Sequence, residues 1–201
     1  MTNIAFIGYR DWSINILRKL ARKTKKVKFI FLHPKKVKFK LAKEIKTYKI
    51  DPKNNDIIFE ILNKNKIEIA LFYGWSWIVK KNVYNNFLCL GLHPSKLPEY
   101  KGGSPLQHQI IDGKKKSAVT VFKINKTIDG GEIFKQTYLN LKNPLNKIFH
   151  DITKKGYQMS IDLVTKYNNN QLVFKKQKIK KKIYLRRKPW ESELKMRDLK
   201  N

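Results

Sequence analysis

The feature that most constrains the fold is an alternation of short apolar runs and amphipathic segments. Asn3–Gly8 and Val27–Leu32 are short apolar runs typical of buried strands, and Ile14, Leu17 and Leu20 recur between them at helical spacing. A strand, a helix and a second strand in this order imply parallel strands joined by a right-handed crossover. The predicted fold class is therefore α/β, with an open, mostly parallel sheet covered by helices on both faces.

The rest of the chain adds elements to this sheet. Ile67–Tyr73 and Phe87–His93 predict two further buried strands. Residues 33–55 are basic and irregular, apart from a short helix expected around 39–45. We also expect helices over 55–62, 105–111 and 144–164, and strands over 118–122 and 132–141. These elements fit a single domain over residues 1–201. Within it, 171–201 is a basic C-terminal extension that contains the segment RRKPWESE at residues 186–193.

The net charge of +30 limits the classes of partner, because a basic chain attracts anions. Nucleic acid is one such partner, but the lysines are spread along the whole chain beside many Asn and Ile residues, which a genome rich in A and T also explains. We therefore expect anionic small molecules instead of nucleic acid. No apolar run approaches the roughly 20 residues that a membrane span needs. A cytoplasmic location with no membrane partner is expected, and a homodimer is compatible with it.

Candidate chemistry is concentrated between Leu90 and Phe134. His93 ends an apolar run, and Asp129 stands 36 residues later in a Gly-rich turn. An imidazole oriented by a carboxylate can act as a general acid and base near neutral pH. The spacing alone fits a loop histidine and a capping aspartate equally well, so both interpretations stay open at this level.

The residues around the pair form a longer pattern. It reads H-P-S-x-L-P-x-Y-[KR]-G-G-x-P from His93, then x-x-G-x-x-x-S-x-V-T, then I-D-x-G-x-I around Asp129. This pattern resembles the formyltransferases that depend on 10-formyltetrahydrofolate, and the fold class becomes the Rossmann-like fold of that family. The resemblance implies that N10-formyltetrahydrofolate is the cofactor and that His93 and Asp129 are catalytic. No metal ligand set is expected.

The resemblance also implies a folate site at the carboxyl ends of the strands. In the family, the loop that corresponds to Gly74–Ile78 lines the pterin pocket, although tryptophans in such a loop can equally pack between sheet and helix. The cofactor-binding residues expected from the resemblance are Tyr73, Trp75, Ser76, Trp77, Ile78, Leu88, Leu90, Asn125 and Ile128.

The acceptor expected from the resemblance is a nucleotide-linked amino sugar. Methionyl-tRNA formyltransferases need a further C-terminal domain, for which we expect 201 residues to leave no room, and the Y-K-G-G-S-P segment looks most like the nucleotide-sugar enzymes. The product would serve a surface glycan, for example on a pseudaminic-acid-like route. The alternative is a methionyl-tRNA formyltransferase-like protein or a catalytically weak, RNA-binding relative. The expected substrate-binding residues are Arg10, Tyr100, Lys101, Gly102, Gly103, Ser104, Gln107 and Gln109.

One position departs from the family pattern. Most members carry Asn-x-His, whose Asn helps to bind the oxyanion of the tetrahedral intermediate, whereas this chain has Gly91-Leu92-His93. Losing one oxyanion donor typically lowers the rate by a factor on the order of 10²–10³. We expect the missing donor to be replaced by Ser104, Gln107 or Gln109, through space that the glycine leaves open.

Overall fold

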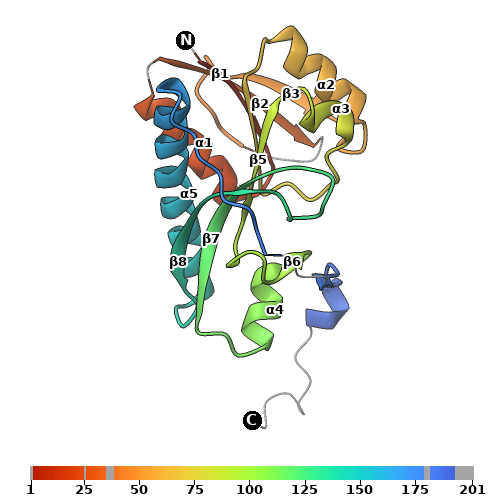
Figure 1. The fold of residues 1–201 in the computed structure, drawn as a ribbon, viewed down its shortest axis with the longest axis vertical. Coiled ribbons are helices and arrows are strands. Elements are labelled where there is room, and N and C mark those ends of the chain that lie inside the picture. The colour runs from red at the N-terminus through yellow and green to blue at the C-terminus, as the bar shows by residue number, and fades with distance from the viewer. Residues whose placement is uncertain (1, 25, 35–38, 179–181, 193–201) are drawn as a thin grey trace.

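A computed structural model describes residues 2–24, 26–34, 39–178 and 182–192 of the chain. Its centre is a seven-stranded sheet in the order β3-β2-β1-β4-β5-β7-β8 (Figure 1). The first five strands in this order are mutually parallel. Strand β7 runs antiparallel to β5, and β8 runs antiparallel to β7. The predicted open, mostly parallel sheet is confirmed. The strands are β1 Thr2–Ile7, β2 Val27–Pro34, β3 Lys46–Ile50, β4 Ile69–Tyr73, β5 Leu88–His93, β7 Lys116–Lys123 and β8 Ile133–Asn140.

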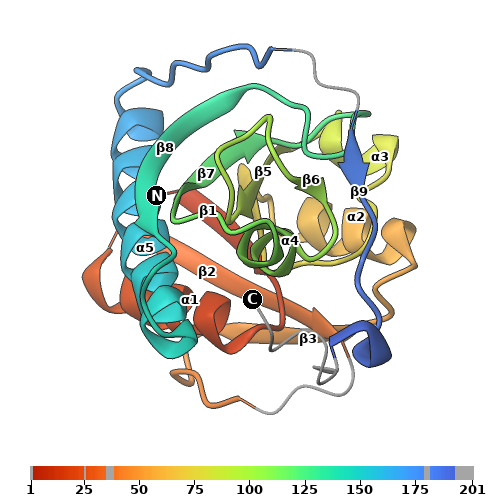
Figure 2. The same cartoon turned by 90° about the horizontal axis from the view of Figure 1, so that it is seen from below.

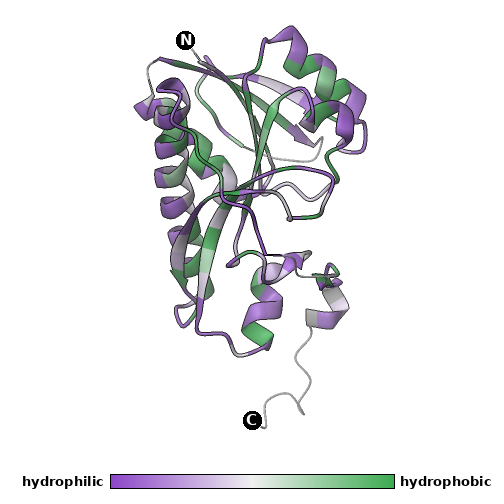
Figure 3. Cartoon of the chain, in the orientation of Figure 1, coloured by the Kyte–Doolittle hydropathy of each residue, from purple (hydrophilic) through white to green (hydrophobic). Residues whose placement is uncertain are grey.

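Helices cover both faces of the sheet, as predicted. On one face, α1 (Asp11–Lys23) and α5 (Leu145–Asn168) pack over a core that includes Ile14 and Met159. On the other face, α2 (Asn55–Lys64) and the short α3 (Lys81–Tyr84) cover a second core. Apolar residues gather on the strands and on the inner sides of the helices (Figure 3), so burial of both faces accounts for the layered architecture.

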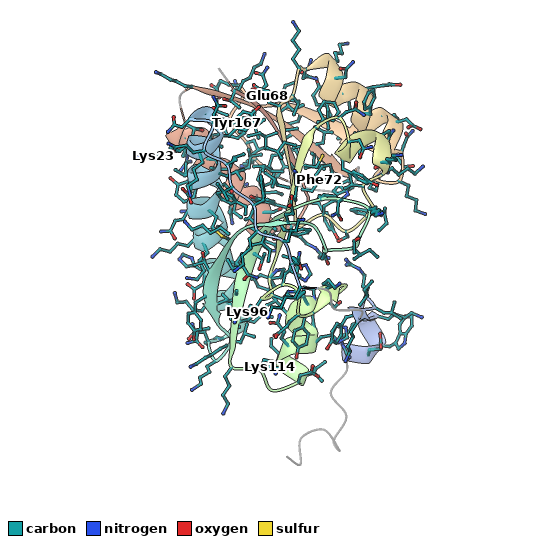
Figure 4. The ribbon with its side chains drawn as sticks, viewed as in Figure 1. Lys23, Glu68, Phe72, Lys96, Lys114 and Tyr167 are labelled. Carbon is teal, nitrogen blue, oxygen red and sulfur yellow. The ribbon has the colours of Figure 1, made fainter. Side chains whose placement is uncertain are left out.

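Helix α5 packs closely against the sheet because it carries a glycine at the contact. A Cβ atom at Gly156 would lie 2.6 Å from Ile16 Cδ1 and 2.7 Å from Leu92 Cδ1, so a larger residue would push the helix away from α1 and β5. At the far end of α5, Tyr167 donates a hydrogen bond of 3.1 Å to Glu68, which stands just before β4 (Figure 4).

The region after β2 differs from the prediction. We expected a helix around 39–45, but the structure has a turn there, followed by the edge strand β3. Phe39 and Leu41 pack against the core under α1, and Arg18 Nε donates to the Lys40 carbonyl at 2.9 Å. These contacts fasten residues 39–41 to the core and to α1, so tertiary packing overrides local helix propensity.

The end of the described chain forms an element that the sequence does not predict. Residues 172–178 and 182–187, which we call the C-terminal strap, return to the body of the protein after α5. Lys175 pairs with Ile133. Strand β9 (Ile183–Tyr184) pairs in parallel with β6 (Lys101–Gly102), and Figure 2 shows the two strands near each other. A short 3₁₀ helix, η1 (Pro189–Ser192), follows. Residues 179–181 and 193–201 of the predicted extension lie outside the described residues, and the single-domain division stays a prediction.

Within the part of the chain that the structure describes, no helix combines the length and the apolar character that crossing a bilayer requires.

Candidate active site

The site lies at the carboxyl edge of the parallel sheet, where the strand order reverses between β1 and β4. Open α/β sheets bind ligands at such a switch point. Two loops meet there: the Tyr9 hydroxyl lies 2.6 Å from the Ser76 hydroxyl, and the rings of Tyr9 and Trp77 are 5.2 Å apart. Gly8 permits this approach, because a Cβ atom at that position would lie 2.2 Å from the Tyr73 carbonyl oxygen.

His93 is the last residue of strand β5 at this edge, and Asp129, in the turn between β7 and β8, lies beside it. His93 Nδ1 lies 3.5 Å from Asp129 Oδ2, and the His93 side chain is 8% exposed. The other ring nitrogen, Nε2, is 2.7 Å from the Tyr100 carbonyl oxygen. A carbonyl can only accept, so Nε2 carries a proton and donates it. Nδ1 is then the nitrogen that can take up a further proton, directly opposite the carboxylate.

Asp129 is held in a backbone conformation that favours glycine, with φ at 46°. Its Oδ2 accepts a hydrogen bond of 2.7 Å from the Gly102 backbone N–H, so the same oxygen faces His93 and the Gly-rich loop. Strained backbone of this kind persists where surrounding contacts fix it, and it is common at functional sites.

A loop fastened by buried hydrogen bonds follows His93. Thr120 on β7 donates to the Ser95 carbonyl at 2.6 Å, and Gln136 on β8 donates to the Leu97 carbonyl at 2.9 Å. Gln109 from α4 (Pro105–Ile111) donates to the carbonyls of Pro94 and Pro105 at 2.9 and 2.8 Å and accepts from Ser117. Both Gln109 donors are therefore used inside the protein, and the prediction that Gln109 contacts substrate is wrong.

A cavity of about 910 Å³, the first cavity, opens on one side of His93. It unites predicted cofactor residues from two distant segments: Trp75, Ser76, Trp77 and Ile78, and Asn125 and Ile128. Three other predicted cofactor residues lie elsewhere. Tyr73 is fully buried with its hydroxyl 3.1 Å from Ser160 Oγ, Leu90 is fully buried, and Leu88 packs against the core. Alternation along a strand explains the error, since Leu88 and Leu90 point to the face opposite Gly91 and His93.

A second cavity, of about 880 Å³, opens on the other side of His93 along α1. It holds the predicted substrate residues Arg10, Ser104 and Gln107. Its wall is strongly basic: Arg10, Arg18, Lys19, Arg22 and Arg186 line it, against the single acidic residue Asp11. Arg18 and Arg22 were not predicted as site residues, although their i, i+4 spacing on a predicted helix places them on one face.

The two cavities share a wall. Both are lined by Trp75, Ser76, Leu92, His93, Gly102 and Arg186. His93 supplies the imidazole of that wall, so groups bound in the two cavities can meet at its ring.

Two predicted substrate residues, Tyr100 and Lys101, line neither cavity. The Tyr100 ring stacks on Tyr184 of the strap at 4.9 Å, and its hydroxyl donates to Asp112 at 2.8 Å. Burial, together with that hydrogen bond, raises the pKa of Tyr100 above its ordinary value. Lys101 is 6% exposed within β6. The prediction that these two side chains contact substrate is wrong, because the strap, invisible in the sequence pattern, covers them.

The space beside Gly91 is filled by a side chain from the neighbouring strand. A Cβ atom at Gly91 would lie 2.6 Å from Cε1 of Phe122 on β7, and Phe122 itself lines the first cavity. We expected a donor from residues 104–109 to enter this space. The Phe122 ring occupies it instead, and the Ser104 hydroxyl accepts a hydrogen bond from the Arg187 backbone N–H at 3.1 Å.

No group of three or more His, Cys, Asp or Glu side chains that could hold a metal ion occurs among residues 2–24, 26–34, 39–178 and 182–192. The imidazole of His93, the carboxylate of Asp129, the backbone amide of Gly102 and the aromatic wall of Trp75 and Trp77 suit proton transfer next to a flat ligand.

The family model described as formyl transferase matches residues 3–161. The chain belongs to this family. The resemblance seen in the sequence is thereby confirmed. The family draws its formyl group from N10-formyltetrahydrofolate, which was the predicted cofactor.

Two similar proteins are methionyl-tRNA formyltransferases. The enzyme of Rickettsia rickettsii (strain Iowa) is 27% identical over 183 residues, which cover 83% of this chain and 60% of that protein. The solved structure of the enzyme from Clostridium thermocellum is 27% identical with a TM-score of 0.76, and the match covers 98% of this chain and 77% of that chain. The chain thus spans about 60% of the length of the curated relative.

A structure from Mycobacterium tuberculosis, described as a likely sugar N-formyltransferase, shares only the fold. It is 13% identical with a TM-score of 0.72, over 99% of this chain and 84% of that one. Our prediction of a nucleotide-sugar acceptor is wrong, because the relatives with the higher identity are methionyl-tRNA formyltransferases. The Y-K-G-G-S-P segment does not identify the acceptor, because the side chains of Tyr100 and Lys101 are buried beneath the strap.

Proposed function

We propose that this chain transfers the formyl group of N10-formyltetrahydrofolate to the amine of methionyl-tRNA. The observation that carries the proposal is the position of His93, with Asp129 beside its Nδ1, in the wall shared by two cavities. A transfer reaction needs donor and acceptor to approach one acid–base group from two sides. This arrangement supplies that geometry.

We assign the first cavity to the folate. Its aromatic wall of Trp75 and Trp77, with ring centroids 4.8 Å apart, and the turn that contains Asn125 and Ile128 suit a flat pterin flanked by backbone groups. We assign the second cavity to the acceptor. Five Arg and Lys side chains against one Asp suit the phosphates of a tRNA 3′ end better than a neutral ligand.

In the reaction, the uncharged amine attacks the formyl carbon, the carbon–N10 bond breaks, and one proton passes from the amine to N10. His93 holds its Nε2 proton on the Tyr100 carbonyl, so Nδ1 is the position that takes and returns this proton. Asp129 stabilises the imidazolium that forms, because its Oδ2 faces Nδ1. Phe122 excludes water from the space beside Gly91.

The test is formylation of methionyl-tRNA by the purified chain with N10-formyltetrahydrofolate, detected by mass spectrometry of the released formylmethionine. Uncharged tRNA and free methionine are the acceptor controls, and His93→Gln is the enzyme control. We expect formylmethionine from wild type alone, and we expect tRNA affinity to fall steeply with added salt. A folded wild type that binds the folate but forms no formylmethionine in any salt concentration would refute the acceptor assignment.

A further inference from the structure

The strap contacts the turn that carries Asp129. Lys175 and Ile133 exchange two backbone hydrogen bonds of 2.8 Å just after this turn. Two residues further on, Gln177 Nε2 donates to the Asp129 carbonyl at 3.0 Å and to the Gly131 carbonyl at 2.6 Å. The side-chain amide of Gln177 thus spans the turn from one side to the other, through both of its N–H groups.

The strap also holds the loop that carries the other partners of the site. Strand β9 pairs with β6, and the Gly103 N–H donates to the Tyr184 carbonyl at 2.8 Å. This packing is close, because a Cβ atom at Gly103 would lie 2.5 Å from the Arg186 backbone. The Tyr184 ring stacks on Tyr100, whose carbonyl receives the His93 Nε2 hydrogen bond.

These contacts converge on one pair of groups. His93 has two ring partners: Asp129 Oδ2 at Nδ1 and the Tyr100 carbonyl at Nε2. The strap fastens the segment of each partner, and the Gly102 N–H joins the two segments by donating to Asp129 Oδ2. Asp129 has a positive φ, so its turn needs contacts from outside to persist.

We propose that Gln177 is a positioning residue for formyl transfer: through the Asp129 and Gly131 carbonyls it fixes the carboxylate opposite His93. The inference rests on the proposed function, since it concerns the same site. A glutamine at position 177 suits this role better than a lysine or an arginine would. Its Nε2 satisfies two carbonyls at once, and turning the amide over would set its oxygen against both.

The experiment compares Gln177→Leu and Gln177→Glu with the matched control Lys178→Ala, an exposed neighbour on the same strap. Gln177→Leu removes both donors, and Gln177→Glu places an acceptor against two carbonyl oxygens. Misplacing a reacting group by about 1 Å can lower a rate by about 100-fold. We expect kcat to fall by about 10- to 100-fold in both variants, with KM for the folate changed by less than about 3-fold and Lys178→Ala unchanged.

A second readout separates positioning from a purely structural role. The ring nitrogens of the four histidines can be followed by ¹⁵N NMR, with His93→Gln identifying the His93 signals. We expect Gln177→Leu to shift the His93 signals and leave those of His33 in place. If Gln177→Leu does not fold, Gly103→Ala perturbs the strap from its other end and is read in the same way. Unshifted His93 signals with wild-type kcat in the folded variants would overturn the proposal.

The two proposals fail in different ways. If wild type forms no formylmethionyl-tRNA, the proposed function fails, but the shift of the His93 signals still decides whether Gln177 positions the pair. If wild type is active and the strap variants are equally active, only the role of Gln177 falls.

Discussion

Two histidines are buried at the same edge of the sheet, at the ends of parallel strands. His33 is the last residue but one of β2 and is 2% exposed, and His93 is the last residue of β5 and is 6% exposed. His33 lies between the rings of Phe31 and Phe39, at 5.2 and 4.5 Å, and lines neither cavity. His93 faces Asp129 and both cavities. Both histidines are therefore buried near strand ends. Only the residues around each ring distinguish His33, which packs against aromatic side chains, from His93, the candidate acid–base group.

The largest effect should come from the His93 pair. His93→Gln keeps a donor for the Tyr100 carbonyl but has no basic nitrogen, so we expect kcat to fall by about 10³-fold. Asp129→Asn should cost about 10²-fold, because the imidazolium loses its counter-charge. Single-turnover formylation measures both, and thermal unfolding checks the fold. Retained turnover in folded His93→Gln would make the two histidines equivalent and break the comparison.

For His33 the loss should be of stability. His33→Ala removes a ring packed between two aromatic side chains, so we expect the free energy of unfolding to fall by about 2 kcal/mol. The kcat of the molecules that remain folded should stay within about 2-fold of wild type, since β2 ends away from both cavities. Urea unfolding and active-site titration give the two numbers. A tenfold drop in kcat without unfolding would contradict a packing role.

Gly91 tests how tightly the active end of β5 is packed. Gly91→Asn would bring its Cβ to 2.6 Å from the Phe122 ring, and overpacking of this kind costs about 1–3 kcal/mol. We expect the single variant to be less stable and less active, and the double variant Gly91→Asn with Phe122→Ala to regain stability. Phe122→Ala alone is the control. A single variant as stable as wild type would show that the Phe122 ring does not fill this space tightly.

The smallest effect should be the pH dependence of stability that His33 contributes. Burial, and to a lesser degree the charge of Lys49, lower the pKa of His33 below 6.5, while its hydrogen bond to the Pro34 carbonyl opposes the shift. The folded state therefore binds the proton less well than the unfolded state, and this contribution to stability is lost as pH falls below about 6.5. We expect His33→Phe to lose less of its Tm than wild type between about pH 7.5 and pH 5.5. Equal losses would exclude His33 as the source.

Much of the fold and the core of the site follow from local sequence patterns. The parallel strands other than β3 are largely apolar runs, and His93 stands at the end of one of them, β5. Asp129 stands in the Gly-rich turn between β7 and β8, which the sequence pattern around it indicates. The side chains chosen around them were less predictable. Tyr100 and Lys101 stand beside the Gly102-Gly103 pair, and Gln109 stands in α4. The local sequence does not reveal that β9 pairs beside the first two or that Ser117 donates a hydrogen bond to the third. Edge strand β3 has weak alternation and was missed for the same reason, since its pairing with β2 is non-local.

The pairing of β6 with β9 has a consequence in time. It joins segments about 80 residues apart in the chain, whereas the strands of the sheet up to β5 are all made earlier. Bringing such distant segments together lowers the chain entropy, and this loss is offset only when the surrounding contacts have formed. During synthesis, strands β1 to β5 can therefore pair before the strap is made, and at that stage the segments around His93 and Asp129 lack the contacts of the strap. The strap, which is made after these elements, then adds its contacts to the segments that hold Asp129 and Tyr100.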